Sequence, residues 1–179
     1  LFQTDAPESL AVVGAGAVGM EFADIFNAYG TRVTVIEALD RILPLEDKDS
    51  SATVQRSFKK RGVDFFTSAL VQAAEIGEKS VLLTFKDKKG EEQTLAVQNV
   101  LSAVGRVPNS SDLGLEAAGV QLDEQGFFAV DEFMQTNVAG VYALGDCAGK
   151  QLLAHKAMHE GVICVEAIAG VGHGPVDYG

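Results

Sequence analysis

The feature that most constrains the fold is a glycine cluster near the start of the chain, Gly14-Ala15-Gly16-Ala17-Val18-Gly19. An apolar run of the kind that forms buried strands, residues 10–13, comes directly before it. Over residues 17–29 apolar side chains recur at helical spacing, and the pattern stops at Gly30. Residues 32–36 are mostly β-branched and predict a second strand. This order of strand, glycine turn, helix and strand predicts a βαβ unit with parallel strands and a right-handed crossover.

The residues up to 106 extend this unit. Residues 47–61 predict a second helix and residues 63–67 a third strand. Turn signals then separate three short strands of an antiparallel meander, which we expect at 70–75, 80–86 and 92–96. An apolar strand at 99–104 completes the pattern. We therefore expect an α/β fold: a Rossmann-like domain over residues 1–106, with a parallel sheet plus a three-stranded antiparallel meander.

Residues 107–179 follow a different pattern. Their sequence predicts helices at 113–118 and 154–169, short extended pieces at 120–122 and 127–130, and a buried strand at 141–144. These strands are too few for a sheet that is stable by itself. We expect this segment to be part of a second domain that is incomplete within this chain.

The composition argues against several classes of function. Fourteen Lys and Arg against 25 Asp and Glu give a net charge of −11, which argues against binding to nucleic acid or to an anionic membrane. No apolar run reaches the roughly 18 residues of a membrane span. Cys147 and Cys164 are far apart in sequence, so their spacing predicts neither a metal site nor a redox pair, but two buried thiols. The chain starts with neither a signal peptide nor an initiator Met, and we expect it to be part of a longer protein.

The glycine cluster predicts a dinucleotide site because of where it lies. A Gly-x-Gly-x-x-Gly that ends a strand and opens a helix is typical of this use. Gly14 permits the tight turn, Gly16 lets backbone approach a pyrophosphate, and Gly19 lets the helix pack close to the strand. The first N–H groups of the helix would then hold the phosphates without any Lys or Arg. The alternative is a glycine turn that serves packing alone.

Glu37, at the end of the second strand, indicates which coenzyme would bind. A carboxylate there can accept hydrogen bonds from the adenosine ribose hydroxyls and would repel a 2′-phosphate. Ala38 and Leu39 offer no positive charge to such a phosphate, although Arg41 is near in sequence. The sequence therefore favours NAD(H) over NADP(H). FAD uses the same glycine pattern and stays an alternative.

Further motifs along the chain are typical of one enzyme family. In order, they are Gly19-Met20-Glu21-Phe22-Ala23, Ala103-Val104-Gly105-Arg106-Val107-Pro108-Asn109, Thr136-Asn137 and Tyr142-Ala143-Leu144-Gly145-Asp146. Together they resemble the flavin-dependent pyridine-nucleotide disulfide oxidoreductases over essentially the whole chain. A later stretch, Leu152-Leu153-Ala154-His155-Lys156-Ala157 with Glu160-Gly161, resembles the dihydrolipoamide dehydrogenase branch of that family.

The resemblance implies roles for individual residues in the first domain. Glu21, in the first turn of the helix, would orient the nicotinamide carboxamide, Val71 would line the adenine pocket, and Gly105 would lie near the nicotinamide. Ordinary structural roles remain open for two of them. Glu21 could serve the helix dipole, and Val71 could belong to the core alone.

The resemblance also implies contacts with FAD from residues after 105. Arg106 and Asp146 would contact the flavin nucleotide, Asp146 through its ribityl or ribose hydroxyls. Four residues would run beneath the flavin ring: Leu152, Leu153, Ala154 and His155. The alternatives are a surface cation for Arg106, a turn residue for Asp146, and a capping or packing histidine for His155.

The activity implied by the resemblance is oxidation of dihydrolipoamide, with hydride passed through FAD to NAD⁺. The parent would be a homodimer that serves 2-oxo acid dehydrogenase complexes through their lipoyl domain, in a bacterial cytoplasm or a mitochondrial matrix. This chain has no Cys-x4-Cys, no second glycine fingerprint and no His-Pro followed by Glu. We therefore expect this chain to contain no catalytic residue and no metal site. We expect it to be the NAD(H)-binding portion of the parent enzyme and to be inactive by itself. The alternatives are a sister disulfide reductase of the mercuric, glutathione or transhydrogenase type, or a non-catalytic NAD(H)-binding module.

Overall fold

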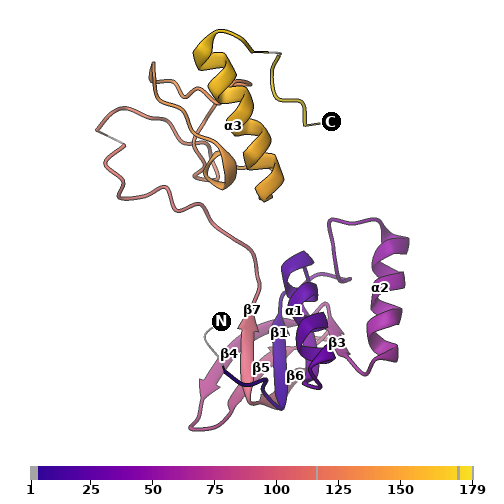
Figure 1. Ribbon diagram of the computed structural model, residues 1–179. Helices are drawn as coiled ribbons and strands as arrows, with labels where there is room; N and C mark the ends of the chain where they lie inside the picture. The colour runs from indigo at the N-terminus through magenta and orange to yellow at the C-terminus, as the bar shows by residue number, and fades with distance from the viewer. Residues whose placement is uncertain (1–3, 116, 173, 179) are drawn as a thin grey trace. The chain divides into compact units, whose positions relative to one another are not determined.

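A computed structural model describes residues 4–115, 117–172 and 174–178. The chain divides after Gly105 into two compact units, one residue before the boundary expected from the sequence. Each unit has its own internal packing and is described by itself. Figure 1 shows the elements of both along the chain.

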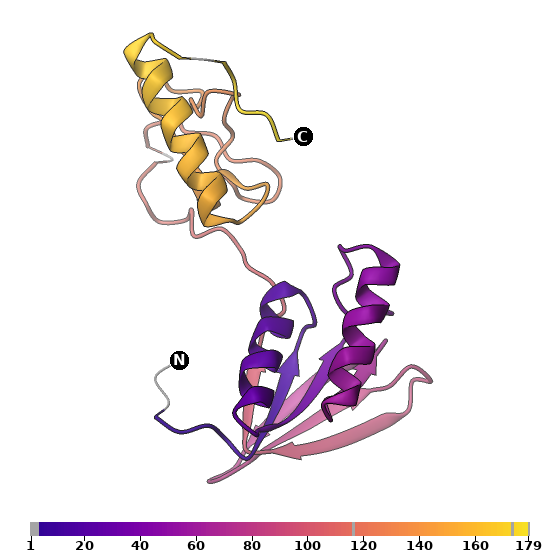
Figure 2. The same cartoon turned by 45° about the vertical axis from the view of Figure 1, so that its right-hand side comes forward.

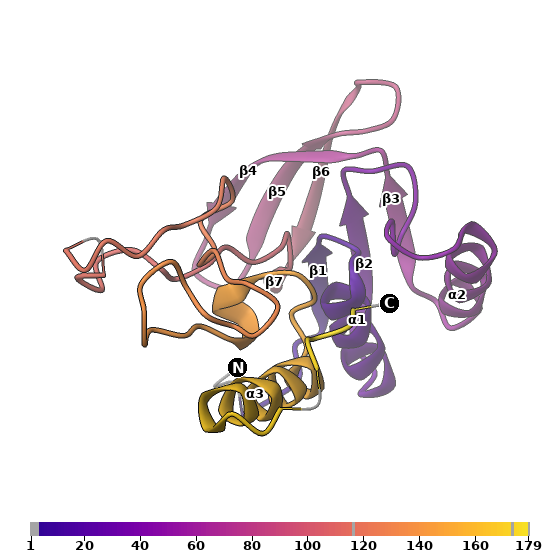
Figure 3. The same ribbon diagram turned by 90° about the horizontal axis from the view of Figure 1, so that it is seen from above.

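The first unit is built on a four-stranded parallel sheet. Its strand order is β3-β2-β1-β7, formed by β1 (Ser9–Val13), β2 (Arg32–Glu37), β3 (Asp64–Thr67) and β7 (Asn99–Ser102). Helices α1 (Ala17–Ala28) and α2 (Lys48–Lys60) cover one face of it (Figure 2). On the other face lies the antiparallel meander β4-β5-β6, formed by β4 (Leu70–Ile76), β5 (Val81–Lys86) and β6 (Glu92–Val97) (Figure 3). The predicted α/β fold with its meander is confirmed.

Alternate residues of the central strand divide the core of this unit in two. Leu10 and Val12 pack on the helix side with Val33 and Val35 of the next strand. Ala11 faces the meander side, in a cluster that includes Leu83 and Phe85 of β5 and Val97 of β6. The two-residue period of a strand produces this division, and it explains why the central strands are apolar on both faces.

The second unit has little regular structure. It contains the 3₁₀ turn η1 (Gly145–Ala148) and the helix α3 (Ala154–Ala169). Elsewhere its described backbone is joined by isolated bridges, such as Leu122 with Phe128 and Gln135 with Tyr142. None of its described helices or those of the first unit is long and apolar enough to cross a membrane.

Two expectations for the second unit were wrong. The helix expected at 113–118 is a series of turns over its described residues, with Glu116 outside them. Gly114 takes a left-handed backbone with φ of 72°, which a helix does not accommodate. The short extended pieces at 120–122 and 127–130 are present and are joined by the single bridge between Leu122 and Phe128. The buried strand expected at 141–144 does not form, because only Tyr142 makes a bridge, to Gln135, and none of its residues is buried. The helix expected at 154–169 is α3.

Candidate functional site

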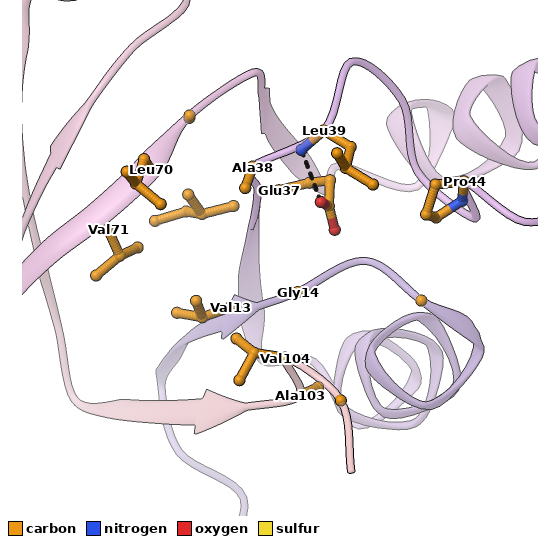
Figure 4. A pocket seen from close by; sticks show the side chains of 14 residues that line it. Val13, Gly14, Glu37, Ala38, Leu39, Pro44, Leu70, Val71, Ala103 and Val104 are labelled. Atoms are coloured by element: carbon orange, nitrogen blue, oxygen red, sulfur yellow. Dashed lines mark hydrogen bonds between the residues drawn. The ribbon is translucent and has the colours of Figure 1, made fainter. Parts of the chain in front are cut away.

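A cavity of about 370 Å³ lies at the carboxyl ends of the parallel strands of the first unit (Figure 4). Val13 and Glu37 end two of these strands, and Ala103 follows a third. Apolar side chains line the rest of the wall, among them Leu39, Pro44, Leu70 and Val71. Parallel α/β sheets bind ligands at this edge, where the strand order reverses beside the first strand. The size falls in the range of small-molecule sites.

The three glycines of the cluster have different surroundings. At Gly14, φ is 96° and a Cβ would collide with the carbonyl of Ala103. At Gly19, a Cβ would collide with the carbonyl of Gly14, so helix and strand approach closely there. A Cβ at Gly16 would meet nothing within 4 Å. Two glycines are therefore required by the fold itself, whereas the third leaves open space at the cavity wall.

The start of α1 is left without a side-chain cap. Its N-cap is Gly16, and no side chain accepts a hydrogen bond from the first turn. The contrast is α2, where Asp47 accepts hydrogen bonds from the backbone N–H groups of Asp49 and Ser50. The first N–H groups of a helix have no partner within it, so the open end of α1 is suited to an anion such as a phosphate.

Glu37 lies at the cavity wall and also holds the glycine loop. Its side chain is buried, and Oε2 accepts a hydrogen bond from the backbone N–H of Ala15 at 2.6 Å. Oε1 accepts another from the N–H of Leu39 at 2.8 Å (Figure 4). The carbonyl of Ala15 in turn accepts from the N–H of Leu43 at 2.7 Å. Each carboxylate oxygen keeps a further lone pair, so the group can hold the loop and still accept from a ribose hydroxyl.

Arg41, the nearest cation in sequence, is bound to its own loop. Its Nη2 donates to the carbonyl of Pro44 at 2.7 Å, and Nη1 lies 3.6 Å from Asp40. These contacts hold the guanidinium to its own loop but use only part of its five N–H donors, and its Nε is buried without a partner among the described residues. The expected preference for an unphosphorylated ribose therefore rests on Glu37.

Of the other residues expected to bind the coenzyme in the first unit, two line the cavity and one does not. Val71 and Gly105 both line the cavity. Val71 also packs against the core cluster on the meander side, so both of its proposed roles fit the structure. Glu21 is exposed on α1 and is not among the cavity residues. It lies in the second turn, not the first as expected, since the first turn contains no acidic residue. A role for Glu21 in the helix dipole loses its basis.

The residues expected to meet FAD come together within the second unit. Asp146 lies in η1 and forms an ion pair with Arg106 at 2.9 Å, with both side chains partly exposed. Leu152 and Leu153 lead into α3, and Ala154 and His155 are its first residues, exposed to solvent. The N-cap Leu153 gives no side-chain cap, so α3 also begins with open N–H groups. An exposed carboxylate beside an open helix start fits the hydroxyls and the electron-rich edge of a flavin nucleotide.

Sequence reasoning missed a buried polar cluster in this unit. The ammonium of Lys156 lies 3.1 Å from Oε1 of Glu160, and both side chains are more than nine-tenths buried. The phenol of Tyr178 donates to the same carboxylate at 2.6 Å. Burial raises the pKa of Glu160, but the hydrogen bonds from Tyr178, the Gly145 N–H and Lys156 outweigh it and hold the pKa below its ordinary value of 4.5. Burial and the neighbouring carboxylate raise the pKa of Tyr178.

Neither cysteine is placed as a reactive group. Cys164 is buried, and burial together with the negative charge of Asp131 raises the pKa of its thiol. Cys147 is only half-buried, so the expectation of two buried thiols was wrong for this residue; its thiol donates to the carbonyl of Leu144 at 3.1 Å. Over the described ranges, no three side chains of His, Cys, Asp or Glu gather in a way that could hold a metal ion.

Comparison with known proteins gives a consistent result. Residues 1–161 match the family model described as pyridine nucleotide-disulphide oxidoreductase. A dihydrolipoyl dehydrogenase of Rhizobium etli is 46% identical over 165 residues, which is 92% of this chain and 34% of that protein. The chain thus spans about a third of the length of the curated relatives it matches.

Solved structures agree with this match. LpdA from Mycobacterium tuberculosis is similar with a TM-score of 0.89 at 36% identity, over 98% of this chain and 37% of that one. RclA from Escherichia coli, an HOCl-induced flavoprotein disulfide reductase, gives a TM-score of 0.90 at 30% identity, over 98% of this chain and 39% of that one.

Proposed function

Since this chain belongs to the pyridine nucleotide-disulphide oxidoreductase family, we propose that it is the NAD(H)-binding portion of a dihydrolipoamide dehydrogenase, followed by a central segment of the FAD-binding domain. The observation that carries the proposal is the cavity at the strand ends. It combines an uncapped helix start, an open glycine position and a buried carboxylate in one wall.

In this proposal the first unit binds the phosphates of NAD(H) through backbone N–H groups rather than through Lys or Arg side chains. The open N–H groups at the start of α1 bind the pyrophosphate, which runs along Gly14, Gly16 and Gly19. Glu37 accepts from the adenosine ribose, and the apolar wall at Val71 receives the adenine. Gly105 lies toward the nicotinamide, and Glu21 orients its carboxamide. NAD and FAD supply the redox chemistry when bound.

The second unit contributes contacts to FAD. Asp146 accepts hydrogen bonds from the hydroxyl chain of the flavin nucleotide, with Arg106 beside it. The open start of α3, with Leu152 to His155, lies against the flavin ring. The catalytic disulfide and base would come from parts of the protein outside this chain.

The wider role follows from the same relatives. Their name, dihydrolipoyl dehydrogenase, gives dihydrolipoamide as the substrate. The proposed parent is a homodimer that takes electrons from the lipoyl domain of a 2-oxo acid dehydrogenase complex in the cytoplasm or the mitochondrial matrix. The isolated 179-residue chain is proposed to be inactive toward dihydrolipoamide.

Coenzyme titration tests the proposal. NADH and NADPH are titrated separately into the purified protein and followed by calorimetry, with NADH expected to bind at least about tenfold more tightly. Glu37→Gln keeps the shape of the side chain but removes its charge, so this preference should shrink by about tenfold, or about 1.4 kcal/mol. Its amide nitrogen cannot accept from the N–H of Ala15 or Leu39, so any loosening of the glycine loop should weaken both coenzymes equally and leave the ratio as the readout. Glu46→Gln, an exposed acid outside the cavity, is the matched control and should change neither affinity. Binding of neither coenzyme would overturn the proposal.

A sister flavoprotein disulfide reductase is the second candidate, and the similarity to RclA favours it. The two candidates differ in substrate. Assay of the protein that carries this chain with dihydrolipoamide and NAD⁺ should give NADH. Absence of that activity, together with NADH-dependent reduction of another disulfide or of a metal ion, would favour the sister reductase.

A further inference from the structure

The ion pair between Lys156 and Glu160 does more than fill the interior of the second unit. All three donor directions of the Lys156 ammonium are used: one meets Glu160, and the other two meet the carbonyls of Gly145 and Gly149 at 3.1 and 2.8 Å. Oε2 of Glu160 accepts a hydrogen bond from the backbone N–H of Gly145 at 2.7 Å, and Oε1 accepts one from the phenol of Tyr178. The cluster therefore has its hydrogen bonds satisfied.

These contacts converge on one short loop. Both backbone polar groups of Gly145 form hydrogen bonds with side chains of α3. Its N–H donates to Glu160, and its carbonyl accepts from Lys156. Gly149 is fixed at the other end by Lys156. Both glycines have φ of 75°, and a Cβ at Gly149 would lie 2.9 Å from the ring of Phe127. Asp146 lies between the two anchored positions, on the only turn of η1.

We propose that Lys156 and Glu160 are positioning residues for FAD, which hold the Gly145–Gly149 loop so that Asp146 faces the flavin nucleotide; this rests on the proposed function of Asp146. The pair does not touch the cofactor itself. It acts through the backbone at both ends of the loop, while the carboxylate of Asp146 stays partly exposed and paired with Arg106.

The energetics of buried ion pairs support a role beyond stability. Desolvation of two charges offsets most of their attraction, and apolar residues of similar volume often replace such a pair without loss of stability. Here the two side chains direct their hydrogen bonds at the backbone of a single loop. Apolar replacements can fill the same volume, but they cannot hold those peptide groups in one orientation.

The test uses the double variant Lys156→Met/Glu160→Met in the protein that carries this chain, stripped of FAD and then titrated with it. The melting temperature of the apoprotein is expected to stay within a few degrees of wild type. The dissociation constant for FAD, followed by quenching of flavin fluorescence, is expected to rise at least tenfold, and hydrogen exchange at the Gly145 N–H to accelerate. The matched control is Asp24→Asn/Arg61→Met, which removes an ion pair in the first unit and should leave FAD affinity unchanged.

An FAD affinity within twofold of wild type in a folded double variant would overturn the inference. If that variant does not fold, Glu160→Gln replaces it: it keeps the shape of the side chain, but it removes the charge that pairs with Lys156, and its amide nitrogen cannot accept from the Gly145 N–H. About threefold weaker FAD binding with faster exchange at Gly145 supports the inference, and no change in either overturns it. Asp146→Ala distinguishes failure of this inference from failure of the proposed function. If Asp146→Ala weakens FAD binding and the double variant does not, only this inference fails. If Asp146→Ala leaves the FAD affinity unchanged, the proposed contact of Asp146 with the flavin nucleotide is wrong.

Discussion

In the first unit the fully buried side chains are almost all apolar and come mostly from strands, whereas in the second unit a lysine and a glutamate are buried together. The first unit forms two apolar layers on either side of a sheet. The second has one long helix, and this helix fastens a loop through charged side chains. Each unit positions a candidate binding site. The first unit does so at the ends of its strands, and the second does so through hydrogen bonds from side chains of its helix to the backbone of a loop.

The difference predicts that the largest loss of stability comes from breaking the polar cluster. Lys156→Met leaves the carboxylate of Glu160 buried and without its cation, which costs about 3–5 kcal/mol in such sites. Denaturant unfolding of the second unit should show this loss, and Lys156→Met/Glu160→Met should recover most of it. A single variant as stable as wild type would show that the pair contributes nothing to the packing of the unit.

The corresponding weak point of the first unit is the contact between the start of α1 and the end of β1. Gly19→Ala places a methyl group against the backbone carbonyl of Gly14, which cannot move without disturbing the glycine loop. Overpacking of this kind costs about 1–3 kcal/mol, and we expect about 2 by thermal or urea unfolding. Gly161→Ala in α3 is the matched control, because that helical glycine also has no positive φ but no atom lies within 4 Å of an added Cβ.

Gly16→Ala should separate binding from stability. The added methyl group meets no protein atom and the backbone there has a φ of −70°, so only the poorer N-cap preference of Ala remains, and the free energy of unfolding should change by no more than about 1 kcal/mol. The same methyl group would lie where the pyrophosphate approaches, and NADH affinity should fall at least about tenfold. Calorimetry with NADH beside thermal unfolding measures both. An unchanged affinity would place the pyrophosphate elsewhere.

The two units also differ in how much the sequence could predict. In the first unit each strand and helix follows from local apolar periodicity, because both faces of the sheet bury alternate residues of the same strand. The position of Glu37 at the strand end could be predicted as well. Its hydrogen bond to Ala15 could not, since it depends on how the glycine loop folds back over the strand end.

In the second unit local patterns were a poor guide. Residues 113–118 have apolar residues at helical spacing, yet the left-handed Gly114 prevents a helix. Lys156 and Glu160 are four residues apart, a spacing typical of an exposed helical pair. They are buried because Gly145 and Tyr178, distant in sequence, pack over them. Only the i,i+4 pairing itself could have been found in the sequence, and it gave no sign of burial.

The smallest expected effect concerns pH, and it should be confined to the second unit. The pKa of Glu160 is lowered on folding, so its contribution to stability is present above pH 4.5 and is lost as the pH falls below that value. The pKa of Tyr178 is raised, so its contribution is present below pH 10 and is lost as the pH rises beyond it. One hydrogen bond contributes to both directions, because it needs a protonated phenol and an ionised carboxylate; burial adds to the shift of Tyr178, and the Gly145 N–H and Lys156 add to that of Glu160.

Urea unfolding of wild type, Tyr178→Phe and Glu160→Gln over a pH series would measure these contributions. The stability difference between wild type and Tyr178→Phe should be constant from pH 6 to 9 and shrink above pH 10. The difference between wild type and Glu160→Gln should shrink below pH 4.5 instead. The first unit has no such buried ionic pair among its described residues, so its unfolding should show neither change at these positions. Equal differences at all pH values would mean that the phenol and the carboxylate do not share this hydrogen bond in solution.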